Sequence, residues 1–284
     1  MIHKTLCVKI GDKMASERIK YIAGIGDLLL SIMTIVLAVI FWHTLALYLT
    51  FTGLPYLPTP IEAFRAFLLS FVERDLWGHT IIDHCIASLE RVGLGFAIAF
   101  VTAVPLGLIM GWFRSVRVAA YPIVEVLRYI PPIAWIPFSI LLFRVTLFSS
   151  AFIVWIGAFF PILLNTIAST RNIGRAQLEV AVLMGAGRKD LMFKIVVPAA
   201  LPGIITGVRV GLGVGWMCVI AAEFVGVPEG LGLGYYVWTM AAIGRYAEMV
   251  AGMLMIGIIG LLMNYAILFV ERRILRWREE VAGY

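Results

Sequence analysis

The chain has 284 residues, of which 62% are hydrophobic and only 14% are charged, and its formal net charge is +6. Soluble globular domains carry about 25% charged residues, so this composition excludes a soluble domain and predicts an integral membrane protein. The excess of basic residues then indicates cytoplasmic loops rather than a nucleic-acid partner. Cys7, Cys85 and Cys218 are scattered and odd in number, which predicts neither a disulfide framework nor a metal cluster.

Six apolar segments are long enough to cross a bilayer as helices, which takes about 20 residues each. In chain order they cover residues 28–50, 92–113, 116–143, 148–168, 202–225 and 249–270. The third must be kinked or broken, because it contains the prolines Pro122, Pro131, Pro132 and Pro137. We therefore predict an all-α polytopic protein with a leader (1–27), a transmembrane domain (28–271) and a tail (272–284).

The distribution of lysine and arginine predicts how these helices are oriented. If both termini are cytoplasmic, the inner segments carry sixteen basic residues and the outer segments carry five. Cytoplasmic loops hold an excess of basic residues, so we expect a multi-pass protein of the cell membrane with both termini inside. In the outer segment after the first span, LPTPIEAFRAFLLSFV (Leu57–Val72) predicts a short amphipathic helix on the membrane surface.

The inner loop, residues 171–200, has the pattern of a folded element rather than of a simple connection. Gly185 and Gly187 break a helical pattern. After them an apolar face follows at helical spacing, formed by Leu191, Met192, Ile195 and Val196. We expect a short helix, a glycine elbow and a second helix that ends at Pro198, with a new helix starting at Pro202. The loop is either an interfacial helix pair or a docking element for a cytoplasmic partner.

The fifth span carries a glycine at every fourth position, namely Gly203, Gly207, Gly211 and Gly215. This spacing places the glycines along one helix face, the pattern that lets helices approach closely in lipid. Such a ridge serves packing within one subunit, a subunit interface or a moving gate.

Charged side chains within spans are costly in lipid and usually face protein or water. Glu125 and Arg128 are three residues apart and can pair on one helix face. Arg128 also precedes the Pro131–Pro132 break, where freed backbone groups favour a cavity lining, so it would either attract an anion or serve only as the partner of Glu125. The candidate pathway residues are Glu125, Arg128, Pro131, Pro132, Trp135, Arg209 and Glu223.

Two of these residues have a second interpretation. Arg209 lies where a long side chain could simply extend to the inner interface. Glu223 is expected to mark the outer end of its span, before a re-entrant or gating loop.

A group of polar residues, His79, Asp83, His84 and Cys85, falls in the outer segment. We expect these residues on a solvated helix, and we assign no metal site and no catalytic residue. An intramembrane enzyme is the alternative from another functional class, but it would need a nucleophile with a base, or paired carboxylates, within the spans. The histidine within a span, His43, has no evident partner of this kind.

The stretch EVAVLMGAGRKDLMFKIVVPAALPG, Glu179–Gly203, resembles the EAA loop of ABC importer permeases. The family pattern is E-A-A-x-x-x-G, nine residues, then I-x-L-P, and it is matched by Glu179, Ala181, Gly185, Ile195 and Pro198. The segments RYIPPIAWIPF, GVRVGLGVGWMCVIAAEF and GLGLGYYVW resemble permeases of the nitrate, taurine, alkanesulfonate and bicarbonate importers. The chain departs from them at residues 143–146, FRVT, where such permeases usually have a Gly-x-Gly turn.

The resemblance implies a type I ABC importer permease fold with six transmembrane helices. It implies that the loop couples to an ATP-binding subunit, through Glu179, Ala181, Gly185, Ala186, Gly187, Arg188 and Lys189. It also implies a homodimer in membrane lipid, two ATP-binding subunits and an extracytoplasmic solute-binding protein. The chain has no G-x-x-x-x-G-K-[ST] phosphate loop, so ATP and Mg²⁺ are expected on the partner and no cofactor on this chain. The expected solute is a small anion (a sulfonate, nitrate, bicarbonate or organic carboxylate), or else a non-anionic small organic molecule.

Overall fold

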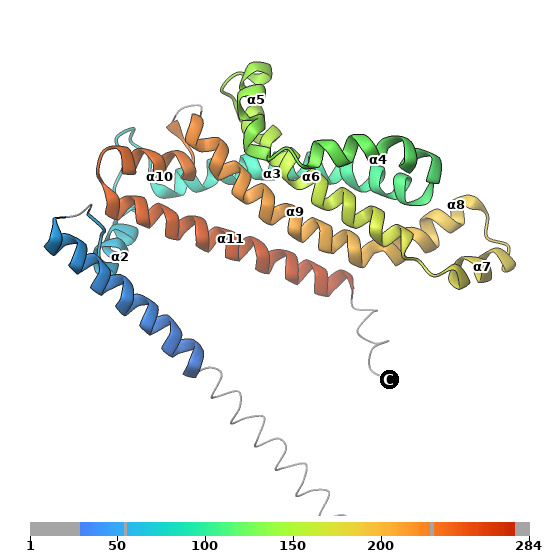
Figure 1. The fold of residues 1–284 in the computed structure, drawn as a ribbon, viewed down its shortest axis with the longest axis horizontal. Helices are drawn as coiled ribbons and strands as arrows, with labels where there is room; N and C mark the ends of the chain where they lie inside the picture. The colour runs from blue at the N-terminus through green and yellow to red at the C-terminus, as the bar shows by residue number, and fades with distance from the viewer. Residues whose placement is uncertain (1–28, 54–55, 228–229, 276–284) are drawn as a thin grey trace, which may run out of the picture. The chain divides into compact units, whose positions relative to one another are not determined.

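The structure is a computed structural model, and it describes residues 29–53, 56–227 and 230–275. Within those ranges every regular element is a helix (Figure 1). The chain divides into two compact units, Met1–Arg65 and Ala66–Tyr284. The predicted leader, 1–27, and most of the predicted tail, 272–284, lie outside the described residues.

The first unit contains an apolar helix over Leu29–Thr52 that exposes most of its side chains, as a lipid-facing helix does. Trp42 on this helix donates its indole N–H to the carbonyl of Pro58 at 3.1 Å. The amphipathic helix α2, Pro60–Leu69, begins in this unit with a capping box. Glu62 accepts the Thr59 N–H at 2.8 Å and the Tyr56 hydroxyl at 2.8 Å, and these two donors lower the pKa of the Glu62 carboxyl.

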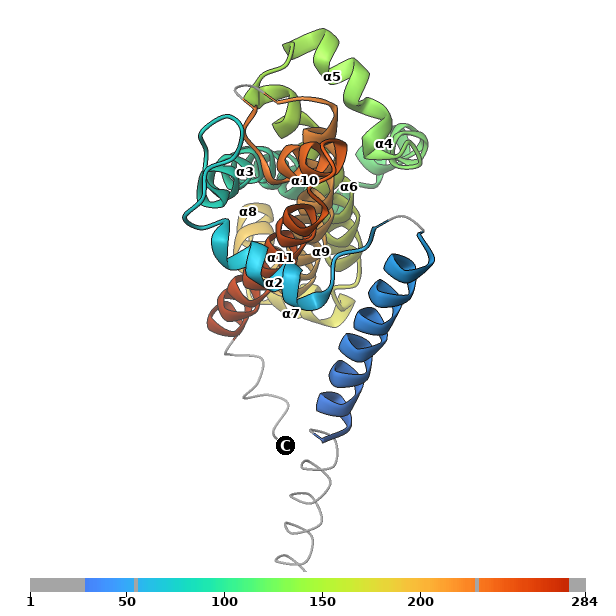
Figure 2. The ribbon, with the colours of Figure 1, turned by 90° about the vertical axis from the view of Figure 1, so that its left-hand side faces the viewer.

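The second unit is a bundle of long helices with shorter ones at its ends. Its elements are α3 (Ile81–Trp112), α4 (Arg114–Arg128), the 3₁₀ turn η1 (Pro132–Trp135), α5 (Ile136–Phe143), α6 (Leu147–Arg171), α7 (Arg175–Leu183), α8 (Arg188–Asp190), the π-helix η2 (Leu191–Val196), α9 (Val197–Val225), α10 (Leu233–Ala242) and α11 (Tyr246–Ile274). The helix α6 packs against both α3 and α9 and is the most buried of the long helices, whereas α4 and α5 lie at the edge of the bundle (Figures 1 and 2).

Two large apolar clusters hold the bundle together. One joins α3 and α4 to α6 through Ala99, Met110, Val124, Ile162 and Leu163, among others. The other joins α3, α9, α10 and α11 through Val92, Trp216, Leu233, Met240 and Ile259, among others. Helix association in lipid depends on this kind of close packing rather than on escape from water.

Among the described residues, five helices are long and apolar enough to cross a membrane, and the count is six if the bent pair of α4 with η1 and α5 is one span. The two arms of that pair meet at 91° next to Pro131 and Pro132, so the expected break is present. The second span is longer than the predicted 92–113, because α3 begins at Ile81. A capping box explains this start, since Asp83 Oδ2 accepts the Thr80 N–H at 2.8 Å.

The glycine ridge of α9 faces α6. A Cβ atom at Gly203 would meet Ser169, and one at Gly207 would lie 2.8 Å from Asn165 Cβ. Further along, a Cβ at Gly211 would lie 2.9 Å from Ile162, and one at Gly215 would lie 3.2 Å from Val154. These close approaches support the interpretation that the ridge serves packing within the subunit.

Candidate functional site

The inner loop is a helix, a tight elbow and a second helix, at one end of the bundle (Figure 1). The helix α7 ends in a Schellman motif, in which the Gly185 N–H donates to Val182 O at 2.9 Å and the Ala186 N–H donates to Ala181 O at 3.0 Å. Gly185 has a φ of +87°, which explains why a glycine stands there. Gly187, with a φ of −77°, then starts α8 as its N-cap.

The second helix of the loop does not end at Pro198, contrary to the prediction. The helix that begins at Arg188 continues through η2 and α9 to Val225. The π-helical stretch explains how, because the Val197 N–H donates to Met192 O, one residue further back than in an α-helix. Pro198 therefore falls in the first turn of α9, directly after this π-helical stretch, where the change of bonding register accommodates a residue without an N–H. Pro202 also lies inside α9 rather than starting a helix.

The elbow presents an apolar surface that none of the described residues covers. Leu183 and Met184 are 86% and 83% exposed, and Val182 and Phe193 are exposed as well. Charged residues flank this surface, and Glu179, Arg188 and Lys189 are all exposed. Of the two alanines assigned to the elbow, Ala186 is half-buried and Ala181 is buried. Such a patch on the water side of a membrane protein indicates a protein contact.

Glu125 and Arg128 are in direct contact at the end of α4, one turn apart and just before the break. Arg128 Nη2 donates to Glu125 Oε1 at 2.6 Å and to the Tyr129 hydroxyl at 3.0 Å, and the guanidinium lies 4.7 Å from the Tyr129 ring centre. The charge of Arg128 is thus already matched within the chain. Beyond the break, Trp135 packs edge-on against Phe138.

Arg209 lies on the face of α9 that is turned toward α11, where it pairs with Glu271. A cavity of about 220 Å³ begins beside this pair and is lined mainly by apolar residues of the two helices, including Leu212, Trp216 and Met263. Arg209 is 38% exposed, so it is both paired and open to its surroundings.

Glu223 lies two residues before the end of α9, near the end of its span as expected, and it is fully buried there. Arg91 Nη1 donates to Glu223 Oε1 at 2.7 Å, Ser88 donates to the same oxygen at 2.8 Å, and the Gly234 N–H donates to Oε2 at 2.8 Å. The carboxylate therefore joins α9 to α3 and α10, and its environment is closed. A Cβ atom at Gly232 or Gly234 would collide with it, which explains the glycines there.

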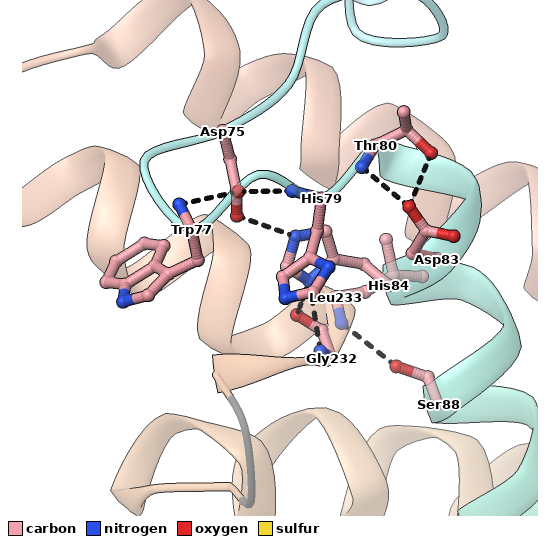
Figure 3. A network of polar contacts seen from close by, with 9 residues as sticks. All are labelled: Asp75, Trp77, His79, Thr80, Asp83, His84, Ser88, Gly232 and Leu233. Atoms are coloured by element: carbon pink, nitrogen blue, oxygen red, sulfur yellow. Dashed lines mark hydrogen bonds and ion pairs between the residues drawn. The ribbon is translucent and has the colours of Figure 1, made fainter.

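His84 continues this network and is also fully buried, so the expectation of a solvated helix was wrong for it (Figure 3). The Gly232 nitrogen and carbonyl oxygen lie 3.0 and 3.1 Å from His84 Nδ1, and His84 Nε2 lies 3.0 Å from Asp75 Oδ2. Asp75 in turn accepts the backbone N–H groups of Trp77 and His79 (Figure 3). The network connects the loop before α3 to the start of α10.

The other members of the polar group have smaller roles. Asp83 is the capping residue of α3, and Cys85 is half-buried. Beside His84, burial raises the pKa of the Tyr236 hydroxyl to about 12, so this residue adds no charge to the network at neutral pH. The pattern of the sequence did not single out Asp75, Ser88 or Arg91. The available signal was Arg91 itself, since a charge beside an apolar span needs a partner of opposite sign.

The chain matches known proteins over most of its length. Residues 103–279 match the family described as binding-protein-dependent transport system inner membrane component. A Methanocaldococcus jannaschii protein assigned by name to the ABC transporter permeases is 38% identical over 89% of this chain and 93% of that protein. The taurine transport system permease protein TauC of Escherichia coli is 29% identical over 97% of this chain and all of that protein. The bicarbonate transport system permease protein CmpB of Synechococcus elongatus is 31% identical over 79% and 83%.

The fold also has a solved counterpart. The inward-facing MetNI methionine ABC transporter contains a chain that superimposes with a TM-score of 0.61 at 20% identity, over 68% of this chain and 95% of that one. This agreement confirms the all-α type I importer fold that was predicted. The relatives are transport subunits and not enzymes, and importers of this kind work with an ATPase and a binding protein. The chain therefore belongs to the binding-protein-dependent transport system inner membrane components, as a multi-pass permease subunit of an ABC importer.

Proposed function

We propose that this permease forms one half of a pathway for a small anionic solute, as a homodimer in which each copy docks one ATP-binding subunit on its inner elbow. The observation that carries the proposal is the elbow: an exposed apolar tip at Leu183 and Met184 is flanked by the charges of Glu179, Arg188 and Lys189. The partner supplies ATP and Mg²⁺, because this chain lacks a phosphate loop.

Docking at the elbow also predicts how the permease is oriented across the membrane. An ATP-binding subunit works in the cytoplasm, so α7 and α8 face inward and both termini lie inside. The basic residues of the inner segments support the same orientation.

Docking can be tested by changing the elbow in the complete importer. Gly185→Pro, or Glu179→Lys, should leave the complex assembled but uncouple ATP hydrolysis from transport. The measurement is solute uptake per ATP hydrolysed in proteoliposomes, with expression and co-purification of the ATP-binding subunit as controls. Normal uptake by both variants would contradict the coupling role.

The homodimer follows from the absence of an internal repeat in one chain of six spans. The mass of the intact detergent-solubilised complex tests this stoichiometry. We expect two copies of this chain and two ATP-binding subunits, and a complex that pairs this chain with a different permease would contradict it.

The broken third span is the element that we assign to the pathway, with Glu125, Arg128, Pro131, Pro132 and Trp135 around its break. The bend frees backbone groups, and the buried indole N–H of Trp135 has no hydrogen-bond partner among the described residues. Such groups need water or a second chain, which a pathway on the dimer axis provides. Arg209, paired but open, is a further pathway candidate, whereas the closed environment of Glu223 favours a structural role.

The anionic solute class rests on the named relatives, which are permeases for taurine, nitrate and bicarbonate. Uptake of labelled taurine, nitrate and bicarbonate by the reconstituted importer with its binding protein tests the class. Uptake of a neutral organic solute in place of all three would contradict it.

A further inference from the structure

Among the described residues, Arg144 is the one residue other than glycine whose φ is positive. Its φ of +58° and ψ of −165° lie in a region that glycine adopts easily and that residues with a Cβ adopt at a cost. Seven other described residues have a positive φ, and all of them are glycines: Gly53, Gly78, Gly185, Gly226, Gly230, Gly232 and Gly244. Arginine at this one position needs an explanation.

The turn itself explains the conformation but not the choice of residue. Arg144 is the C-cap of α5, and its N–H donates to Ile140 O at 2.7 Å. Its carbonyl accepts the N–H of Thr146, which is already the N-cap of α6. A turn this short between two helices requires the unusual φ. Because glycine would meet that requirement with less strain, what arginine adds is its side chain.

The side chain of Arg144 is exposed, and no hydrogen bond or ion pair is formed by its guanidinium within the described ranges. The other arginine near the break, Arg128, has its charge matched by Glu125 at 2.6 Å. The neighbours of Arg144 are exposed and apolar, including Leu141, Phe143 and Val145. An unpaired cation beside apolar surface attracts an anion more strongly than one fully surrounded by water, because the local dielectric is lower.

We propose that Arg144, at the outer end of the broken span, is a specificity-determining residue that contacts the anionic solute as it enters the permease. This inference rests on the proposed function, which places the broken span on the pathway and the elbow inside. The guanidinium has a planar fork of donors that fits the oxygens of a carboxylate, sulfonate, nitrate or bicarbonate. The turn sets the position of the Arg144 backbone between α5 and α6, from which the guanidinium extends.

Three substitutions separate the effect of the Arg144 charge from the effect of its strained backbone. Arg144→Lys keeps a charge and the strain, Arg144→Ala removes the charge and keeps the strain, and Arg144→Gly removes both. Arg74→Ala is the matched control, since Arg74 is another exposed outer arginine with an ordinary backbone. Each variant is reconstituted as the complete importer, and uptake of labelled taurine, nitrate and bicarbonate is measured.

We expect uptake of the transported anion to depend on the positive charge at residue 144, and thermal stability to depend on whether the residue there relieves the backbone strain. Uptake should fall about tenfold or more in Arg144→Ala and Arg144→Gly, the size of one lost charge-assisted hydrogen bond, and should be largely kept in Arg144→Lys and Arg74→Ala. The thermal midpoint should rise by roughly 3 °C in Arg144→Gly alone, because only glycine relieves the turn. The KM for the binding protein should stay unchanged in all four.

Wild-type uptake by Arg144→Ala would overturn the proposal while leaving the proposed function intact. Loss of uptake in Arg144→Gly alone would overturn it too, because the turn and not the charge would then matter. A raised KM for the binding protein in Arg144→Ala would assign the arginine to docking instead of the solute. If the wild-type importer takes up a neutral organic solute in place of all three anions, the solute class is wrong and the role of Arg144 falls with it.

Discussion

Arg91 on α3 donates a hydrogen bond of 2.7 Å to Glu223 on α9, although 132 positions separate the two residues in the chain. Both side chains are buried, with 4% and 0% of their residue surface exposed. Ser88 and the Gly234 N–H donate to the same carboxylate, so its charge is met by three donors. The pair fixes three helices at one point, and this makes it a sensitive place for substitution.

Arg91→Met should lower the free energy of unfolding by about 3–5 kcal/mol, because it leaves Glu223 buried without its cation. The double change Arg91→Met, Glu223→Gln should recover most of this loss, since no buried charge remains. Denaturant unfolding of the purified subunit in detergent measures both. The control is Arg245→Met, which removes a partly exposed pair with Glu248 and should cost about 1 kcal/mol or less. Equal effects at Arg91 and Arg245 would contradict the structural role.

Gly207 and Gly213 lie on the same helix, α9, and differ in what surrounds them. A Cβ atom at Gly207 would lie 2.8 Å from Asn165 Cβ and 3.1 Å from the Pro161 carbonyl, whereas one at Gly213 would meet nothing within 4 Å. Gly207→Ala should therefore destabilise the subunit by about 1–3 kcal/mol through overpacking. Gly213→Ala should be neutral or stabilise it by about 0.5–1 kcal/mol. Thermal unfolding distinguishes the two, and a harmless Gly207→Ala would show that the ridge is loosely packed.

Gly185 and Gly187 provide a similar contrast within the elbow. Gly185 has a φ of +87° and Gly187 has a φ of −77°, so only the first position strains an alanine. We expect Gly185→Ala to cost about 1–2 kcal/mol locally and to lower solute uptake per ATP hydrolysed. Gly187→Ala should behave like wild type, because its Cβ would have ordinary contact with Asp190. Parallel assays of uptake and ATP hydrolysis measure both, and loss of coupling in the Gly187 variant alone would reverse the assignment.

A single and a double substitution can distinguish a structural role of Arg128 as the partner of Glu125 from direct contact with the solute. If Arg128 serves mainly to hold Glu125, Arg128→Ala should reduce expression and uptake together, and adding Glu125→Gln should restore both, because no unmatched carboxylate then remains. Quantitative expression and proteoliposome uptake of the two variants provide the measurement. If expression returns in the double variant but uptake does not, Arg128 contacts the solute directly.

Local patterns in the sequence predicted the parts of the structure that depend on neighbouring residues. Hydropathy located the six spans, adjacent prolines located the break at Pro131 and Pro132, and the glycines located the elbow. Each of these is decided within a few residues, by the cost of polar groups in lipid or by the φ that a turn demands. The elbow is the clearest example, because the whole Schellman motif lies between Val180 and Ala186.

Contacts between distant segments were not accessible in the same way. The burial of Glu223 depends on the Arg91 pair, whose partner no spacing rule identifies. The burial of His84 depends on Asp75 and on the backbone of Gly232, which has no side chain to suggest the contact. The continuation past Pro198 depends on a π-helical turn, which no pattern in the sequence indicates.

The uninterrupted helix from Arg188 to Val225 has a mechanical consequence. Its 38 residues follow a path of roughly 57 Å at 1.5 Å per residue, almost twice the thickness of about 30 Å for the hydrocarbon core. The path bends at the π-helical stretch Leu191–Val196, where the bonding register changes, so that α8 leaves α9 at an angle (Figure 1). Beyond the bend, α9 leads to Glu223, the junction with α3 and α10. Under the docking proposed for the elbow, a displacement of α8 would pass through this bend and reach the far end of α9 as tilt or twist, because a hydrogen-bonded helix stretches very little.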